Sequence, residues 1–248
     1  MVGRHNQPGA GNESRSTVFS RDVHRGMRYD RIKVVSFDAD GTLVDPSFMD
    51  RFWFYGIPSL YADKKGVGLR EAIEHVTAEY DKMGPEDLRW YLPSYWIEHF
   101  GLGVSVTKIL NGLAGHLKVY PDVPSALKRL NAKYDLIVAS SSPRELLEFE
   151  LVTIGSYFAR VFSSVSDFGQ PGKTAAFYLN ICDSMGVEPG EMLHVGDQRD
   201  LDLEVPSSVG VQALLLDREG VAQDKLVIKS LHELVIRLKT GHDRVPGL

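Results

Sequence analysis

The fold of this chain can be predicted from one stretch, Ile32-Lys33-Val34-Val35-Ser36-Phe37-Asp38-Ala39-Asp40-Gly41-Thr42-Leu43. Its first half, residues 32–37, is mostly apolar and rich in β-branched and aromatic side chains, which predicts a strand buried in a sheet. The apolar run ends at two aspartates, a glycine and a threonine. A buried parallel strand delivers such residues to the carboxyl edge of its sheet, where open α/β sheets bind their ligands. We therefore expect the functional site to be built around Asp38 and Asp40.

Two carboxylates in one turn indicate a cation site and phosphorus chemistry. Crowded carboxylates stay ionised only beside a cation, and hard oxygen ligands select Mg²⁺, which often holds a phosphate as well. One carboxylate can attack phosphorus, and the other can move protons. Gly41 can take a backbone conformation closed to other residues or let a ligand approach closely. The alternative is an acidic turn or a helix N-cap without catalytic function.

Length, composition and charge narrow the class of protein. The 248 residues are 43% hydrophobic and 25% charged, which is ordinary for a soluble globular protein with one large domain or a core carrying an insertion. The net charge of −5 argues against nucleic acid or an anionic membrane as a partner. No apolar run is long enough for a transmembrane helix. The single cysteine, Cys182, excludes an intramolecular disulfide and fits a reducing, cytoplasmic setting, and we expect it to be a buried apolar residue.

Three segments differ in their residue pattern. Residues 1–28 are rich in Gly, Asn, Ser and Arg without an apolar core, which predicts a disordered extension rather than a secretory signal or a basic arm. Residues 44–118 lack strand-like runs and hold all three tryptophans, which predicts an inserted helical domain. Residues 29–43 and 119–248 form the predicted α/β core.

The inserted segment is rich in aromatic side chains. Most of them are expected to build its own hydrophobic core, although a dimer face remains an alternative, so that the protein is a monomer or a homodimer. Those nearest the acidic turn are candidates for lining a substrate pocket, namely Phe48, Phe52, Trp53 and Tyr55. Gly84-Pro85-Glu86-Asp87-Leu88 has the composition of a helix start, with proline in the first turn and acids after it.

The core alternates short apolar runs with helical patterns. The strand-like runs are residues 32–37, 136–139, 161–165, 192–195 and 211–216, and the helical patterns are residues 121–131, 143–154, 173–186 and 230–238. This alternation predicts parallel strands joined by crossover helices in a three-layer α/β arrangement.

Small polar or charged residues follow these strands. Besides Asp38 and Asp40 they are Ser140 after the second strand, Lys173 after the third, and Asp197 after the fourth, with Asp200 and Asp202 just beyond. Carboxylates, a hydroxyl and an ammonium at one sheet edge predict a site for a phosphate and a metal ion. The hydroxyl would donate to a phosphoryl oxygen, and the lysine would offset negative charge.

Other local patterns have rival interpretations. Gly172-Lys173-Thr174 resembles the end of a phosphate-binding P-loop, but the required preceding glycine is replaced by Asp167, so a nucleoside triphosphatase is rejected. His194 lies inside a predicted strand, where a hydrogen-bonded core histidine is expected rather than a metal ligand. Asp200 is expected to be a solvated loop acid.

In this order the motifs resemble those of the haloacid dehalogenase (HAD) superfamily. Asp38-Ala39-Asp40-Gly41-Thr42 matches the DxDGT motif, and Gly196-Asp197-Gln198-Arg199-Asp200-Leu201-Asp202 matches GDxxxxD. Ser140 and Lys173 match the two motifs that stand between them. The match spans residues 32–216 and implies a Rossmann-like core with a helical C1 cap, as in phosphoglycolate phosphatases and β-phosphoglucomutases.

The resemblance implies a role for each matching residue. Asp38 would be the nucleophile that forms an aspartyl-phosphate, and Asp40 the general acid and base. Mg²⁺ would be held by Asp38, the backbone carbonyl of Asp40, and Asp197. The phosphoryl group would be bound by Thr42, Ser140, Ser141 and Lys173, with Gly41 and Asp202 in support. The partner would be a small phosphorylated metabolite.

Three functions stay open. The aspartate at Asp40 favours a phosphatase, because dehalogenases and phosphonatases of the family lack it. A phosphomutase of the same fold and a non-catalytic binding protein are the alternatives. Three places depart from the family pattern. Thr174 stands where proline is common, and Ser141-Ser142-Pro143 follows Ser140 where asparagine often stands early. Val205-Pro206 replaces a Gly-Ala pair, which predicts that the helix after Asp202 begins late.

Overall fold

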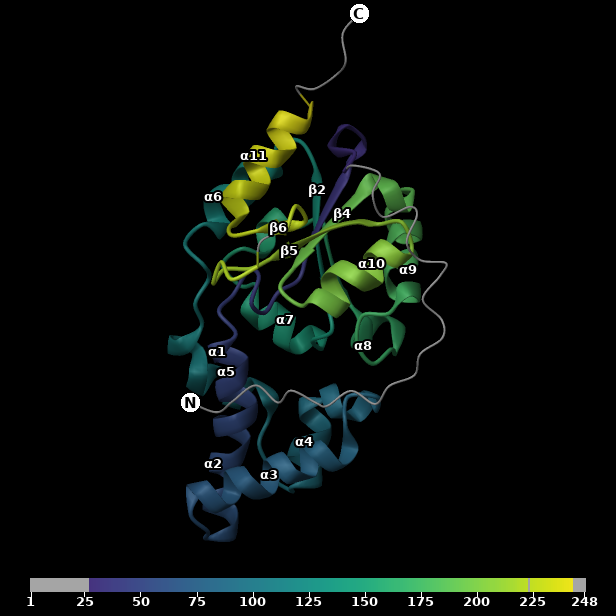
Figure 1. The fold of residues 1–248 in the computed structure, drawn as a ribbon. Helices are drawn as coiled ribbons and strands as arrows, with labels where there is room; N and C mark the ends of the chain where they lie inside the picture. The colour runs from purple at the N-terminus through teal and green to yellow at the C-terminus, as the bar shows by residue number, and fades with distance from the viewer. Residues whose placement is uncertain (1–26, 223, 243–248) are drawn as a thin grey trace, which may run out of the picture.

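The computed structural model describes residues 27–222 and 224–242, in which six strands form one parallel sheet (Figure 1). The extension predicted at residues 1–28 lies almost entirely outside the described residues. The strands are β1 (Val34–Phe37), β2 (Asp135–Ser140), β3 (Arg160–Ser163), β4 (Met192–Gly196), β5 (Gln212–Leu216) and β6 (Val227–Ile228). Their order in the sheet is β3-β2-β1-β4-β5-β6, so β1 lies between β2 and β4. The short β6 is a strand that the sequence pattern did not predict.

The register aligns the carboxyl ends of the central strands. Phe37 at the end of β1 pairs with Val138 of β2 and with Val195 of β4. All four residues of β1 are buried, as expected for a parallel strand covered on both faces. The residues that follow β1, β2 and β4 therefore emerge at the same edge.

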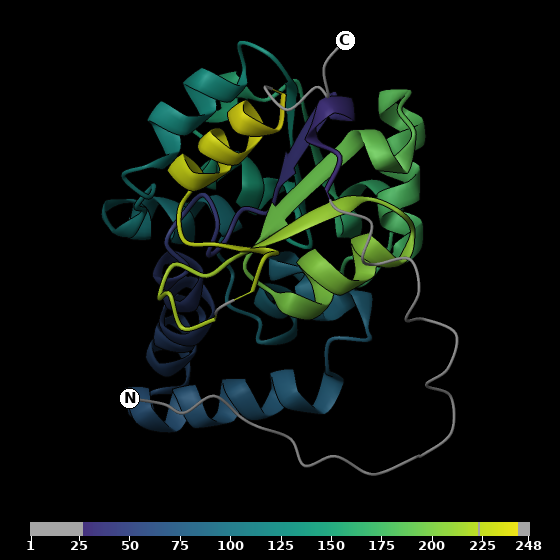
Figure 2. The same cartoon turned by 45° about the horizontal axis from the view of Figure 1, so that its top comes forward.

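Helices cover both faces of the sheet (Figure 2). One face packs against α6 (Val123–Leu130), α7 (Arg144–Glu150) and α11 (Leu231–His242), and the other against α9 (Ala175–Met185), with α8 (Ser164–Phe168) and α10 (Val205–Ser208) nearby. Cys182 of α9 is buried among apolar side chains, as predicted. The molecule is therefore an α/β protein with the predicted three layers.

A helical insertion separates β1 from β2 and lies beyond the carboxyl edge of the sheet (Figure 1). It consists of α1 (Ser47–Arg51), the π-helix η2 (Phe52–Gly56), α2 (Ile57–Lys65), α3 (Leu69–Met83), the 3₁₀ turn η3 (Leu88–Tyr91), α4 (Pro93–His99), α5 (Val106–Leu113) and the 3₁₀ turn η4 (Ala114–His116). None of the helices in the described ranges is long and apolar enough to cross a membrane.

One antiparallel bridge with two backbone hydrogen bonds ties the insertion to the core. Val44 and Val119 form a bridge, the N–H of Asp45 donates to the carbonyl of Lys118 (2.8 Å), and the N–H of Tyr120 donates to the carbonyl of Leu43 (3.1 Å). The chain therefore leaves and re-enters the core at one point, next to the acidic turn.

The aromatic side chains of the insertion mostly pack inward. Phe48 and Phe52 are fully buried in a cluster with Trp96, and the Phe48 ring stacks on Phe149 of α7 at 5.6 Å. The expectation that Phe48 and Phe52 line a pocket is therefore wrong, because core packing uses both rings. Tyr55 is 48% exposed.

Two local predictions also differ from the structure. The residues after Gly84 form turns and η3 rather than an α-helix, because the Asp87 carboxylate accepts the N–H of Arg89 (2.9 Å) and closes a tight turn. The helix after Asp197 begins early rather than late, as the π-helix η7 (Arg199–Glu204), which continues into α10. The extra residue in a π-turn changes which side chains face the site.

Candidate active site

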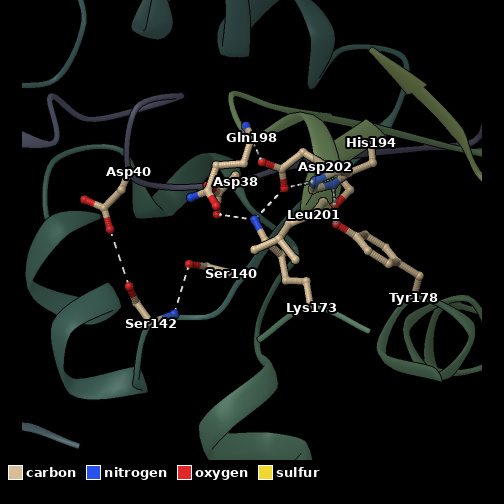
Figure 3. A network of polar contacts seen from close by, with 11 residues as sticks. Asp38, Asp40, Ser140, Ser142, Lys173, Tyr178, His194, Gln198, Leu201 and Asp202 are labelled. Atoms are coloured by element: carbon tan, nitrogen blue, oxygen red, sulfur yellow. Dashed lines mark hydrogen bonds and ion pairs between the residues drawn. The ribbon is translucent and has the colours of Figure 1, made fainter. Parts of the chain in front are cut away.

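The carboxyl edge of the sheet brings together residues from four parts of the chain (Figure 3). Asp38 follows β1, Ser140 ends β2, and Asp197 follows β4. Lys173 ends the loop before α9. The side chains of Asp38, Lys173 and Asp202 point toward one another, while Asp40 lies to one side, next to Ser142.

The acidic turn needs its glycine for two reasons. The carbonyl of Ala39 accepts the N–H groups of Leu43 (2.8 Å) and Val44 (3.1 Å), which closes the chain tightly after Asp38. Gly41 has φ +73°, which disfavours any side chain. A Cβ atom at Gly41 would also lie 2.3 Å from Oδ2 of Asp197. The glycine therefore lets the acidic turn approach the Asp197 carboxylate closely.

Lys173 joins two of the carboxylates. Its Nζ lies 2.9 Å from Oδ1 of Asp38 and 2.5 Å from Oδ1 of Asp202, and all three side chains are almost fully buried. Burial alone would raise the pKa of Asp202, but the Lys173 ammonium and the His194 ring outweigh it and hold that pKa well below the ordinary value. Burial would likewise lower the pKa of Lys173, but Asp202 and Asp38 raise it. The lysine is therefore a fixed positive charge beside Asp38.

The start of α9 fixes this lysine. Gly172 has φ +72°, and the Thr174 hydroxyl accepts the N–H of Phe177 (3.2 Å) as the N-cap of the helix. Thr174, where the family usually has proline, thus gives the helix a capped start directly after Lys173.

Three carboxylates converge at this point. One oxygen each of Asp38, Asp197 and Asp202 lies within 4.8 Å of the other two. Although Asp197 reaches solvent, its partial burial raises its pKa to about 7, and the charges of Asp38 and Asp202 add to the shift. Such a set of oxygen donors with excess negative charge fits a hard divalent cation. Asp202 already accepts bonds from Lys173, His194 and the Gln198 N–H, which leaves Asp38 and Asp197 as the freer ligands.

Asp40 lies in a different environment from Asp38. Its Oδ2 accepts a hydrogen bond from the Ser142 hydroxyl (3.4 Å), and burial raises its pKa to about 7 against the effects of Glu150 and Ser142. Asp38, by contrast, contacts Lys173. The two carboxylates of the turn are therefore differentiated, one next to a cation and one able to hold a proton near neutral pH.

A model of the haloacid dehalogenase-like hydrolases matches residues 32–210. The chain belongs to this family. It is 24% identical to the GMP/IMP nucleotidase YrfG of Escherichia coli over 78% of this chain and 86% of that protein, and 24% identical to the phosphoglycolate phosphatase of Chromobacterium violaceum over 87% of this chain and all of that protein. The crystal structure of a HAD phosphatase from Thermococcus onnurineus superposes with a TM-score of 0.72 at 26% identity, over 86% of this chain and all of that one.

The hydroxyl groups of this HAD-like hydrolase lie where a ligand can use them. The Ser140 hydroxyl accepts the N–H of Ser142 (3.2 Å), so its own proton is free to be donated elsewhere. The buried hydroxyls of Thr42 and Ser141 have no hydrogen-bond partner among the described residues. Buried polar atoms without a protein partner are uncommon and indicate a missing ligand or water.

Asp167 also explains why the P-loop interpretation fails. Its carboxylate pairs with the Arg144 guanidinium (2.5 Å) and accepts the N–H of Ser163 (2.8 Å). Asp167 therefore fixes the start of α8 instead of opening a phosphate-binding loop. Asp200 is exposed, as expected, but it lies in the π-helix η7 rather than in a loop.

Sequence reasoning missed Glu150, the last residue of α7. It is fully buried, neither carboxyl oxygen has a hydrogen bond of good geometry among the described residues, and it lies beside Asp40. Burial, with Asp40 adding to it, raises the pKa of Glu150 well above the ordinary value. The position could have been found in the sequence, because Glu150 falls three and four residues after Leu147 and Leu146, on the buried apolar stripe of α7.

Proposed function

We propose that this protein is a Mg²⁺-dependent phosphatase that hydrolyses a small organic phosphomonoester through an aspartyl-phosphate at Asp38. The observation that carries the proposal is the contact of Asp38 with Lys173, with Asp197 close by and Asp40 to one side, next to Ser142. A carboxylate nucleophile can approach an anionic substrate when a fixed cation beside it offsets the repulsion between the two negative charges. A second carboxyl group with a pKa of about 7 can donate and accept protons. The names of the nucleotidase and the phosphoglycolate phosphatase support a phosphate ester as the substrate.

The reaction would take two steps. An oxygen of Asp38 attacks phosphorus, the bond from phosphorus to the ester oxygen breaks, and the protonated Asp40 gives its proton to the leaving alcohol. Asp40, now a carboxylate, takes a proton from water as that water attacks the phosphorus of the aspartyl-phosphate. The bond to Asp38 breaks, inorganic phosphate leaves, and both aspartates return to their starting forms.

The other residues would bind and orient the phosphoryl group. Lys173 and the hydroxyls of Ser140, Ser141 and Thr42 supply a positive charge and donors for its oxygens. Asp38, Asp197 and the backbone carbonyl of Asp40 would hold Mg²⁺, which supplies further neutralisation of the phosphoryl charge. Residues 44–118 would act as a cap domain that closes over the substrate and selects it.

The test is phosphate release from a panel of small phosphomonoesters, with Mg²⁺ and with EDTA. The panel includes phosphoglycolate, GMP, IMP and sugar phosphates, and compares wild type with Asp38→Asn. Asp200→Asn is the matched control, because it removes an exposed carboxylate from the same segment as Asp197. We expect Mg²⁺-dependent release that Asp38→Asn abolishes and Asp200→Asn leaves unchanged.

Two outcomes would contradict the proposal. No release from any ester by the folded, Mg²⁺-loaded protein would favour the phosphomutase or the binding protein. Release that survives in Asp38→Asn would remove Asp38 from the role of nucleophile.

A further inference from the structure

We propose that Ser36 and His194 are positioning residues that hold Asp202, and through it Lys173, in the orientation that phosphoryl transfer needs. The inference rests on the proposed function and extends it to two residues inside the sheet. Neither belongs to the motifs that mark the family in this sequence, and His194 was expected to be only a core histidine.

The contacts form one chain of buried side chains, and Figure 3 shows the part of it that runs from His194 through Asp202 and Lys173 to Asp38. Nδ1 of His194 lies 2.9 Å from the Ser36 hydroxyl, and its Nε2 lies 3.0 Å from Oδ1 of Asp202. The same oxygen contacts Nζ of Lys173, which in turn reaches Asp38. Ser36, His194 and Asp202 have no solvent exposure. These hydrogen bonds are therefore not exchanged with water.

The direction of the bond to Asp202 follows from its chemistry. An ionised carboxylate can only accept, so Nε2 of His194 carries a proton and donates it. The second oxygen of Asp202 accepts the N–H of Gln198 (2.9 Å). With Lys173, three donors thus fix this carboxylate. Without His194, only the flexible lysine side chain would hold Oδ1.

The sheet makes His194 a rigid support. Ser36 and His194 are directly paired in the register of β1 and β4, and Ser36 precedes Asp38 by two residues, so they lie on the same face of the strand. The Tyr178 ring packs against the His194 ring at 5.0 Å and 67°. The Tyr178 hydroxyl donates to the carbonyl of Leu201 (2.7 Å), next to Asp202. The His194 ring, packed against Tyr178, therefore links β1, the strand that leads to Asp38, to the segment that carries Asp202.

The absence of a side chain at Gly196 leaves room for the Asp202 carboxylate. A Cβ atom on Gly196 would lie 2.3 Å from Cγ of Asp202, so the glycine lets the carboxylate approach β4 closely. Asp202 can then reach both the imidazole and Lys173. A core histidine that served packing alone would need neither this approach nor a charged partner.

The test compares kcat, KM and the melting temperature of four variants. His194→Met keeps an apolar side chain of similar size but loses the donor, whereas His194→Gln keeps an amide donor. Ser36→Ala removes only the hydroxyl. Cys182→Ala is the control, because it takes volume from the buried layer on the same face of the sheet without touching the network.

We expect His194→Met to lower kcat about 10- to 100-fold, the range seen when the partner of a site residue is lost. KM should change by less than about threefold, since Lys173 opposes charge that develops in the transition state. His194→Gln should retain most of the wild-type kcat. Ser36→Ala should lower kcat by about threefold, less than His194→Met does. Cys182→Ala should lower the melting temperature but not kcat.

The outcomes separate this inference from the proposed function. No phosphate release by wild type would overturn the proposed function itself. With an active wild type, a folded His194→Met variant with unchanged kcat would overturn the inference, as would His194→Gln being as impaired as His194→Met. If His194→Met does not fold, wild-type kcat in Ser36→Ala would decide against it.

Discussion

The protonation of buried Glu150 can be tested through the pH dependence of the free energy of unfolding. Burial and Asp40 raise the pKa of Glu150 in the folded state far above the unfolded value near 4.5. Folded Glu150 therefore keeps its proton at pH values where the unfolded chain has lost it. A group with a raised pKa contributes its full stability below the unfolded pKa and loses that contribution as pH rises toward the folded pKa.

The size of the effect follows from proton counting. Over the interval in which only the unfolded state is ionised at Glu150, the free energy of unfolding falls by about 1.4 kcal/mol per pH unit. Glu150→Gln keeps the shape but cannot ionise. From pH 5 upward the variant should therefore gain stability relative to wild type, by up to about 1.4 kcal/mol per pH unit for as long as folded Glu150 keeps its proton.

The assay is urea denaturation at pH 5, 6 and 7 in EDTA, for wild type, Glu150→Gln and Glu148→Gln. Glu148 lies on the same helix but is exposed, so its variant should follow wild type at every pH. Parallel stability curves for wild type and Glu150→Gln would refute the reasoning, because they would mean that Glu150 ionises alike in both states.

Three further predictions concern the site. Lys173→Met should abolish turnover and destabilise the fold by about 3–5 kcal/mol in denaturant titrations, since it leaves Asp38 and Asp202 buried without their cation; unchanged stability would contradict this. Because Asp40, with a pKa of about 7, must be protonated to act as the acid, kcat for an ester with a poor leaving group should fall as pH rises above about 7, and a flat profile would argue against that role. Gly41→Ala should lose about 1–2 kcal/mol of stability through its positive φ and weaken Mg²⁺ binding in calorimetry by displacing Asp197, whereas wild-type Mg²⁺ affinity would contradict the close approach.

Much of the fold and the main candidate residues could be predicted because the evidence for them is local. The apolar run before Asp38 predicts a buried strand, and β1 is such a strand. Residues that follow parallel strands must share an edge, and this predicted that Lys173 and Asp202 would lie near Asp38.

What could not be predicted depends on packing between distant segments. The contact of Ser36 with His194 follows from the register of β1 and β4, which the sequence does not specify. Glu150 meets Asp40 only because α7 packs against the acidic turn. The residues after Gly84 have the composition of a helix start but form a tight turn, because the Asp87 carboxylate accepts the backbone N–H of Arg89.

The proposed mechanism requires that Asp38 becomes phosphorylated during turnover. The most direct measurement is acid quenching of the Mg²⁺-loaded enzyme in steady state with its best phosphomonoester, followed by mass spectrometry of the proteolysed protein. We expect one phosphoryl group on the peptide that contains Asp38, absent without substrate and absent in Asp38→Asn. A turning-over enzyme with phosphate on another residue, or with an unmodified Asp38 at every quench time, would contradict it.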